Sequence, residues 1–535
     1  MKKRFVVSSK VFPPIFFISL AVAVALIFLL DLSHRFFLPS VIIANITVIL
    51  YLVRAQKKAQ YGALASLTAL VPLFFYLCHF LYQTAFQLGL AEYDKYIIFD
   101  LQLYKEATTL ALAGLFSLLA GSCFAELLYS KEEDLQLRDQ AGVRANNDRK
   151  FYRIAVTSSV VFFLIFVEEV LRIGAAKFAT MSYSDPNLMT QLSRVMDNSQ
   201  KFFMFSVIAA IASMPRDKWK KSIVLPGALA LVFVVILAAW GYRGHTGIFL
   251  LVCYCMFAIR IRPLPLKVLA VLFIGMIISW SIILTARSIP ISERDYSSIL
   301  DRSATSDSIL ETALRTPGQM ITTVSRAMSL YPHTFPYLLG KSYLDSIYYI
   351  IPNIFGEKRN SSSLYSFSVR MSSHYYFGGI SRSKITRGMG STPLAEAYGN
   401  FGVFGLVVLF FLGWFVTRVE LMCLYSKECW RLAFLGVVSY TILWAMRNDA
   451  LSVPRGIIYG YVLLKMQLLC TSLDEIRLKE PHPTIKCISK KERIHPLPRK
   501  FPATKIKQEL KASPFSVKAP KRNMSTPSAS TRTVN

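Results

Sequence analysis

Residues 11–31 read VFPPIFFISLAVAVALIFLLD, with a single charge at the last position. About 20 apolar residues in a helix cross the ~30 Å hydrocarbon core of a bilayer, so this stretch is long enough to span a membrane. Similar runs recur as far as residue 470, whereas soluble cores show periodic apolar stripes. The sequence predicts an all-α polytopic membrane protein with about twelve transmembrane helices, at 11–31, 38–53, 61–83, 107–128, 154–171, 201–214, 222–240, 246–260, 266–286, 393–417, 432–446 and 452–470.

The formal net charge of +29 would suit a nucleic-acid partner. A nucleic-acid binder gathers its basic residues on a soluble domain or one helix face, whereas here they lie mostly between the apolar runs. If the N-terminus is cytoplasmic, the short inner segments hold 23 Lys and Arg and the short outer segments hold 10. This asymmetry follows the positive-inside rule, so we expect both termini in the cytoplasm and no nucleic-acid partner.

The first apolar run follows Met1-Lys2-Lys3-Arg4, as in a signal peptide. The run is about 21 residues long and no small-x-small cleavage site follows it, so we expect a retained helix. None of the eight cysteines falls in 287–392, and no disulfide framework is expected there. Cys253 and Cys255 lie in an apolar run without a nearby carboxylate or histidine, which indicates small hydrophobic residues rather than metal ligands.

The chain divides into four predicted regions. Residues 1–286 form a first bundle of about nine spans, 287–392 a large extracytoplasmic loop with short helices, and 393–470 the last three spans. Residues 471–535 form a basic tail that ends in a Ser/Thr/Pro stretch, a composition that cannot bury a core. We expect this tail to be disordered and cytoplasmic, and its sequence predicts no function.

The large loop carries twelve Lys and Arg against seven Asp and Glu. Two interpretations remain open: long loops cross the membrane regardless of charge, or the arginines bind an anionic ligand, since guanidinium groups grip phosphate bidentately. Its aromatic residues could stack on sugar rings or anchor the loop at the membrane interface. Within the loop, 308–330 is expected to form an amphipathic helix that lies against the bilayer.

The loop ends in a well-marked helix start. Thr392 is a good side-chain cap, and Pro393 is tolerated at the first helical position. Glu396 falls in the first turn and Asn400 one turn later on the same face. Glu396 either complements the helix dipole or is a functional carboxylate at the membrane surface. The glycines that follow would let another helix approach closely, at positions 399, 402 and 405.

Three arginines are predicted to lie at the same membrane depth. Arg243 occupies a tight outer turn, and Arg287 and Arg447 lie at the outer ends of two spans. Each alone could snorkel to the interface. Together they suit a diphosphate held at the outer leaflet.

These residues resemble the Wzy-type O-antigen polymerases, also called oligosaccharide repeat unit polymerases. The resemblance lies in the Gly-Tyr-Arg-Gly turn at 241–244, the stretch TPLAEAYGNFG at 392–402 and Arg447-Asn448-Asp449, within roughly residues 11–470. It implies a C-type glycosyltransferase-like fold in the bacterial cytoplasmic membrane. It also implies an undecaprenyl-diphosphate-linked glycan donor, no nucleotide sugar and no cofactor, with a chain-length regulator and a flippase as candidate partners.

The reaction that the family implies transfers a growing glycan from its lipid diphosphate to a new lipid-linked repeat unit. Positive charge must stabilise the leaving diphosphate, and a base must accept the proton of the attacking hydroxyl. The candidates for the charge are Arg243, Arg287 and Arg447, and those for the base are Glu396 and His374. No metal cluster or Gly-rich phosphate loop is recognisable in the sequence.

Three other functions remain open. An O-antigen ligase would use the same donor and transfer to a lipid A core. A flippase or exporter should carry charged residues in mid-membrane, for which Glu168 and Glu169 are the clearest buried candidates, near the outer end of a span. A purely structural assembly protein would need none of the site residues. The polymer itself, O-antigen, capsule or exopolysaccharide, is not specified.

Overall fold

Helices account for the secondary structure of this protein as its computed structural model describes it. The described residues are 12–58, 65–88, 100–129, 144–173, 196–265, 320–350, 390–426 and 428–479, with scattered positions between 267 and 297 and near 367–371. They belong to one unit, Met1–Lys479. Within these ranges the chain forms α-helices and short 3-10 turns and no strand, so the all-α prediction is confirmed.

Eleven of the twelve predicted spans coincide with described helices. These are α1 (Phe12–Leu29), α2 (Ser33–Lys58), α3 (Leu67–His79) with α4 (Leu81–Gln87), α5 (Leu101–Leu128), α7 (Arg144–Ile173), α10 (Met196–Ala212), α11 (Trp219–Ser222) with α12 (Val224–Ala239), α13 (Arg243–Arg260), α20 (Pro393–Phe401) with α21 (Leu406–Tyr425), α22 (Cys429–Ala445) and α23 (Val453–Lys479). The remaining span, 266–286, lies mostly outside the described residues.

Length and composition alone give a smaller number of spans. Among the described residues, four helices are long and apolar enough to cross a membrane, and six if two bent pairs each count as one span. Three further apolar helices are shorter, including α22. The chain is therefore a multi-pass helical protein, and twelve spans remain a prediction.

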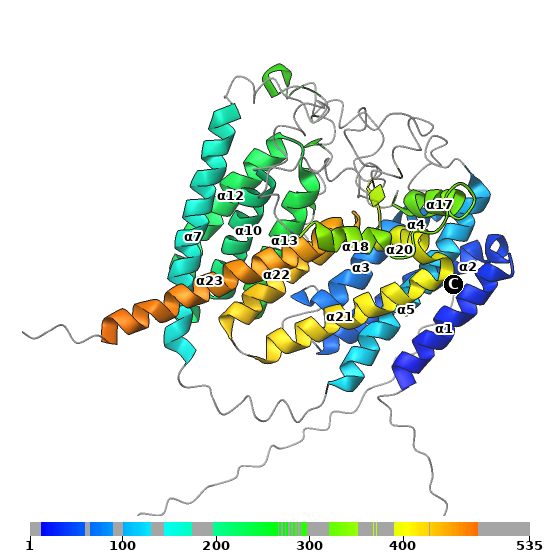
Figure 1. Ribbon diagram of the computed structural model, residues 1–535, viewed down its shortest axis with the longest axis horizontal. Helices are drawn as coiled ribbons and strands as arrows, with labels where there is room; N and C mark the ends of the chain where they lie inside the picture. The colour runs from blue at the N-terminus through cyan, green and yellow to red at the C-terminus, as the bar shows by residue number, and fades with distance from the viewer. Residues whose placement is uncertain are drawn as a thin grey trace, which may run out of the picture. The chain divides into compact units, whose positions relative to one another are not determined.

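Helix α5 packs against α1, α2 and α21, between α21 and the α1–α2 pair in Figure 1. Its crossing with α21 is very close. A Cβ added to Gly121 would lie 1.9 Å from the Phe410 carbonyl oxygen, and one added to Gly413 would lie 2.0 Å from that of Leu118. Small residues allow such backbone contact in membrane bundles, where lipid supplies no hydrophobic drive between helices.

Two short helices come from the predicted loop, α17 (Ile321–Leu330) and α18 (Lys341–Tyr348). They lie at the same end of the bundle as α20 (Figure 1), which we call the α18 end. Helix α17 buries Ile321, Val324 and Ala327, and it packs on α5 and α20. The expectation that this segment lies against the bilayer is wrong for its described part, because protein already covers the apolar side.

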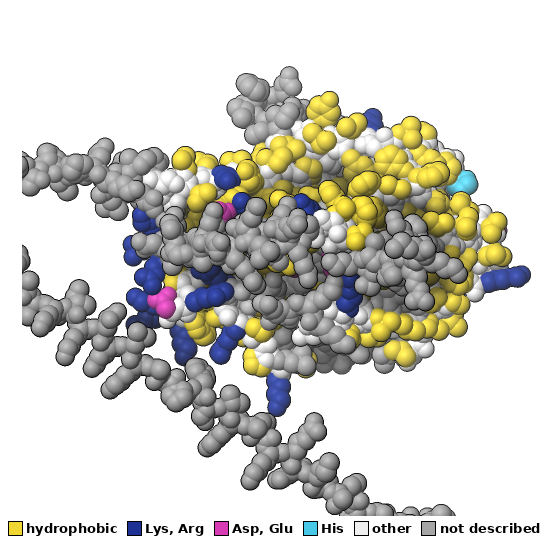
Figure 2. All heavy atoms as spheres, turned by 90° about the horizontal axis from the view of Figure 1, so that it is seen from below, with side chains coloured by type: hydrophobic (Ala, Val, Ile, Leu, Met, Phe, Trp, Pro, Cys, Tyr) yellow, Lys and Arg dark blue, Asp and Glu magenta, His cyan; other side chains and the backbone are white. Residues whose placement is uncertain are grey.

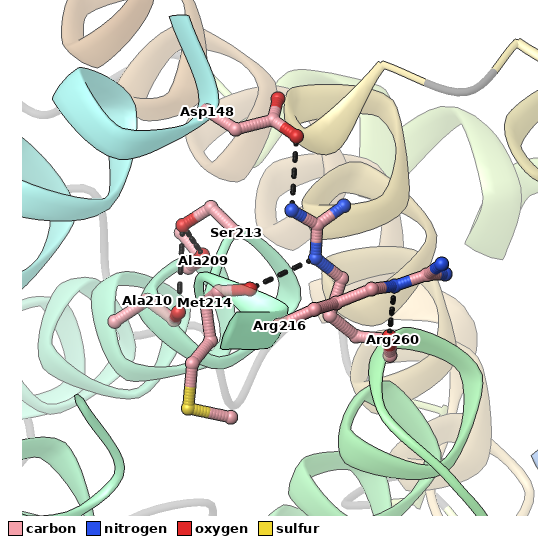
Figure 3. Close-up of polar contacts among 7 residues, drawn as sticks. All are labelled: Asp148, Ala209, Ala210, Ser213, Met214, Arg216 and Arg260. Atoms are coloured by element: carbon pink, nitrogen blue, oxygen red, sulfur yellow. Dashed lines mark hydrogen bonds and ion pairs between the residues drawn. The ribbon is translucent and has the colours of Figure 1, made fainter. Parts of the chain in front are cut away.

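The opposite end of the bundle holds many of the basic residues assigned to the inner face. Figure 2 views that end, and Lys and Arg gather on the side where α7, α12 and α23 lie. Arg260 pairs with Asp148 at 2.9 Å and donates from Nε to the Met214 carbonyl oxygen at 3.0 Å (Figure 3). Arg216 donates to the Arg260 carbonyl oxygen at 2.8 Å. These two arginines therefore bind carbonyl groups at the ends of α10 and α13, as expected at helix C-termini.

The sequence predicts that Glu168 and Glu169 of α7 are buried, and for Glu168 this prediction is wrong. The side chain of Glu168 is 51% exposed and pairs with Arg172 one turn away, because that face of α7 points out of the bundle. Glu169 accepts a hydrogen bond from Ser199 at 2.7 Å. Glu168 is therefore not buried, while Cys253 and Cys255 are buried in the hydrophobic core.

Candidate functional site

The start of α20 is built as the sequence predicts. The Thr392 hydroxyl accepts a hydrogen bond from the Ala395 amide at 3.1 Å, and Pro393 occupies the first turn. The buried His79 of α3 places its Nε2 3.2 Å from the same hydroxyl and its Nδ1 2.7 Å from the Phe75 carbonyl oxygen. A carbonyl only accepts, so Nδ1 carries the proton and the Thr392 hydroxyl donates to Nε2. His79 thus fixes the cap of α20.

The Glu396 carboxylate is buried at the junction of three elements. Its side chain is 1% exposed, and Oε1 accepts from the Ser342 hydroxyl of α18 at 2.5 Å. Oε2 accepts from the Ala450 amide at 2.7 Å, where the short helix η7 (Ala450–Ser452) begins. Because a buried charge is tolerated only with partners, these bonds hold α18, α20 and η7 together around the carboxylate.

Asn400 completes this network on the same face of α20, as predicted. Its Nδ2 donates to the Ser342 hydroxyl and to the Glu396 carbonyl oxygen, each at 2.8 Å. Its Oδ1 accepts from the Gly340 amide at 3.0 Å. Gly340 has φ +87, a left-handed conformation that favours glycine, and it directly precedes α18 as its N-cap residue. Asn400 therefore sets where α18 starts.

Two of the three glycines after Glu396 face aromatic side chains rather than a helix. A Cβ on Gly399 would lie 2.5 Å from the Phe367 ring, and one on Gly402 would lie 2.8 Å from the Tyr337 hydroxyl. Gly402, at φ +60, also ends α20, and the short helix η6 (Gly402–Gly405) separates α20 from α21. The expected helix contact is wrong at Gly399 and Gly402, because aromatic side chains from the predicted loop fill the space. At Gly405 a Cβ would lie 2.5 Å from the Ala397 carbonyl oxygen, so there the backbone of α20 does approach closely.

Arg447 lies against two of the motifs that the sequence analysis singled out. Its carbonyl oxygen accepts from the Ser391 amide at 3.3 Å, directly before the α20 cap. A Cβ on Gly244 would lie 3.7 Å from Arg447 Nη1. The structure therefore brings the 241–244 turn, Arg447 and the start of α20 together.

The structure does not describe the side chains of the other predicted site residues. Arg243 begins α13, but its side chain is not described, and Arg287 and His374 lie outside the described residues. Their roles remain predictions.

Asp449 is a site residue that the sequence analysis did not single out. It is 7% exposed, and its Oδ2 accepts from the Ser368 amide at 3.1 Å. It directly precedes Ala450, which binds Glu396. Tyr343 of α18 lies near Glu396. Desolvation and the Glu396 carboxylate raise the pKa of Tyr343, so its phenol stays protonated. One sequence signal could have indicated Asp449: it is the acidic residue of Arg447-Asn448-Asp449, a motif from which only the arginine was taken as a site candidate.

His245 supports the region around Arg447 from inside the bundle. Its ring stacks on Trp444 at 3.7 Å between centroids, and its Nδ1 lies 2.6 Å from the Tyr440 hydroxyl. Both partners belong to α22, which leads to Arg447. His245 therefore links α13 and the turn before it to α22.

The arrangement suits charge stabilisation and proton transfer. It combines the buried carboxylates of Glu396 and Asp449 with the guanidinium of Arg447, which lies against Gly244. Within the described part of the chain, no group of three or more His, Cys, Asp or Glu could hold a metal ion.

The fold and this site define a multi-pass helical membrane protein. The model of the family described as O-antigen polysaccharide polymerase Wzy matches residues 11–473. The chain belongs to this family, whose members polymerise O-antigen repeat units. Neither the curated proteins nor the solved structures compared with it contain a match.

Proposed function

We propose that this protein polymerises undecaprenyl-diphosphate-linked oligosaccharide repeat units into a surface polysaccharide at the outer face of the cytoplasmic membrane. The family match over residues 11–473 carries the proposal. The positive-inside asymmetry supports placing the α18 end outside and both termini in the cytoplasm.

In the proposed reaction a hydroxyl at the non-reducing end of the new repeat unit attacks the anomeric carbon of the growing chain. A new C–O bond forms, the bond to the lipid diphosphate breaks, and the proton passes to a base. Arg447, with Arg243 and Arg287, would stabilise the charge that develops on the diphosphate. Undecaprenyl diphosphate then leaves.

Glu396 is the preferred base, with His374 as the alternative. Each carboxylate oxygen has two acceptor sites, so the bonds from Ser342 and Ala450 leave capacity for the attacking hydroxyl. Those bonds also hold the carboxylate in one orientation, which a positioned base needs.

Deletion of the gene followed by analysis of the surface glycan tests the proposal. A lost polymerase leaves single repeat units on the acceptor, whereas a lost ligase leaves long chains unattached. A lost flippase traps lipid-linked units inside the cell. Only the first result agrees with the proposed function.

Complementation with variants separates an enzyme from a structural assembly protein. Arg447→Ala and Glu396→Ala should fail to restore long polymer at normal protein abundance. Unchanged polymer length in all such variants, Arg243→Ala and Arg287→Ala included, would leave only the structural role.

A further inference from the structure

Lys465 of α23 is a basic residue within a strip of side chains that faces away from the bundle. Tyr461, one turn before it, is 42% exposed, Met466 is 62% exposed, and Leu469, one turn after it, is 60% exposed. Lys465 itself is partly exposed. A basic residue within a membrane span is rare and usually faces the interior of the bundle, so its position in this strip needs a reason.

The depth of Lys465 follows from its position along the helix. Helix α23 begins at Val453, directly after η7 and therefore at the α18 end. Lys465 lies about 18 Å further along the helix axis, at a rise of 1.5 Å per residue. The hydrocarbon core of a bilayer is ~30 Å thick, so the backbone at Lys465 still lies within it.

The ammonium group of Lys465 is held on aromatic rings. Its Nζ lies 3.8 Å from the Trp430 ring centroid and 5.5 Å from that of Tyr461. The two rings meet edge to face at 6.3 Å between centroids, so they form two sides of one seat. Trp430 is in the first turn of α22, and this helix ends next to Arg447 at the α18 end. Lys465 therefore directs its charge toward the headgroups at the opposite end.

Lys465 has no acidic partner, unlike two arginines of the same end. Arg260 pairs with Asp148 at 2.9 Å (Figure 3), and Arg431 pairs with Glu428 at 2.6 Å. In the part of the chain that the structure describes, no carboxylate pairs with the Lys465 ammonium. An aromatic face attracts a cation but leaves its three N–H donors without an oxygen acceptor. The missing counter-charge must therefore come from outside the described chain.

A phospholipid phosphate fits this vacancy in charge and in depth. The guanidinium of Arg431 lies 5.5 Å from the same Trp430 ring, so two cations and only one carboxylate, that of Glu428, gather around this indole. A zwitterionic lipid balances its phosphate with its own cation, whereas an anionic lipid carries a net negative charge. Basic residues at the membrane surface attract anionic lipids for this reason.

We propose that Lys465, Trp430 and Tyr461 form a binding site for an anionic phospholipid. The lipid phosphate lies on the Lys465 ammonium, and an acyl chain follows the exposed strip of α23. This site lies at the opposite end of the bundle from Glu396, so its occupant is a lipid of the bilayer and not the glycan substrate. The proposal goes beyond the proposed function and does not depend on it.

The affinities of the full-length chain for two phospholipids test this site. Native mass spectrometry measures the binding of phosphatidylglycerol, which is anionic, and of phosphatidylcholine with the same acyl chains, which is zwitterionic. The variants are Lys465→Gln and Lys465→Met, which remove the charge, and Lys465→Arg, which keeps it. The matched control is Lys220→Gln on α11, because Lys220 is an exposed lysine of the same end. Elution as a single species after heating checks that each variant is folded.

Wild type should prefer phosphatidylglycerol. Lys465→Gln should weaken its binding about five- to tenfold and leave phosphatidylcholine unchanged, because one basic residue near the membrane surface contributes about this much to the attraction of anionic lipid. Lys465→Met should give the same result, and it replaces the Gln variant if that protein aggregates. Lys465→Arg should retain most of the affinity, and Lys220→Gln should change neither lipid.

Equal losses of phosphatidylglycerol binding in Lys465→Gln and Lys220→Gln would overturn the site, because they would show only the diffuse attraction of a basic surface. Unchanged affinity in both charge-removing variants would overturn it as well, and Lys465 would then extend only to water. The measurement uses no sugar substrate, so its result is independent of whether the chain polymerises glycan.

Discussion

Two buried carboxylates lie near opposite ends of the segment that α20 and α21 form, Glu396 and Glu420. Both accept from a serine hydroxyl and a backbone amide. At Glu420 the two bonds meet at one oxygen, Oε2, from Ser66 at 3.1 Å and from the Thr68 amide at 2.6 Å. At Glu396 they are divided between the two oxygens.

The partners separate the two sites further. Ser66 is the N-cap residue of α3 and Thr68 lies in its first turn, so Glu420 caps that helix from another span and complements its dipole. Glu396 instead binds α18 and η7, which lie outside the long helices. It lies beside Asp449 and near Arg447. Burial of a carboxylate is therefore not a functional signal by itself; its partners decide the interpretation.

The largest expected effect comes from Glu396→Gln compared with Glu420→Gln. A glutamine at 420 keeps one carbonyl oxygen for both donors, whereas at 396 its NH₂ must face either Ser342 or the Ala450 amide. Loss of a positioned base costs about 10²–10⁴ in rate. We expect Glu396→Gln to abolish long polymer and Glu420→Gln to retain it.

The measurement is the glycan ladder on a gel, with the abundance of a tagged chain as control. If Glu420→Gln loses polymer as completely as Glu396→Gln at equal abundance, the division between a structural and a functional carboxylate is wrong.

The next effect is expected at Arg447, whose carbonyl oxygen binds the Ser391 amide directly before α20. Removing one electrostatic donor to a developing charge costs about 10²–10³ in rate. Arg447→Ala should therefore shorten or abolish the polymer, and Arg447→Lys should recover part of the activity. Initial rates with a lipid-linked repeat unit in nanodiscs measure both. Equal rates for wild type and Arg447→Ala would remove this residue from the mechanism.

Much of the site could be predicted from the sequence because it depends on local chemistry. The cap at Thr392, the first-turn Pro393 and the shared face of Glu396 and Asn400 all follow from helix geometry, and the structure confirms them. The helices at eleven predicted spans follow equally from apolar runs.

The remainder depends on contacts between distant segments. Ser342, Ala450 and His79 reach Glu396 or the α20 cap from segments far away in the chain. A serine in a short amphipathic helix or a histidine in an apolar run carries no sign of its partner. For the same reason the sequence did not reveal that α17 would be covered by protein.

Glu420→Ala should act on stability rather than on catalysis. It leaves the Ser66 hydroxyl and the Thr68 amide without this acceptor, and an unsatisfied buried donor costs about 1–3 kcal/mol. We expect a lower apparent Tm of the detergent-solubilised chain, with activity per folded molecule close to wild type. An unchanged Tm with lost activity would instead place Glu420 in the mechanism.

The smallest effect is expected at Glu168, which also tests the transporter alternative. Its side chain is 51% exposed and paired with Arg172 within α7, and exposed pairs of this kind contribute about 0.3–0.5 kcal/mol. Glu168→Gln should therefore leave both polymer length and Tm unchanged within error, with Arg172→Gln as the matched control for the same pair. A flippase that used this carboxylate on its transport path would lose export on the same change, and lipid-linked units would accumulate inside the cell. Because the side chain points out of the bundle rather than into a shared path, we expect no such accumulation.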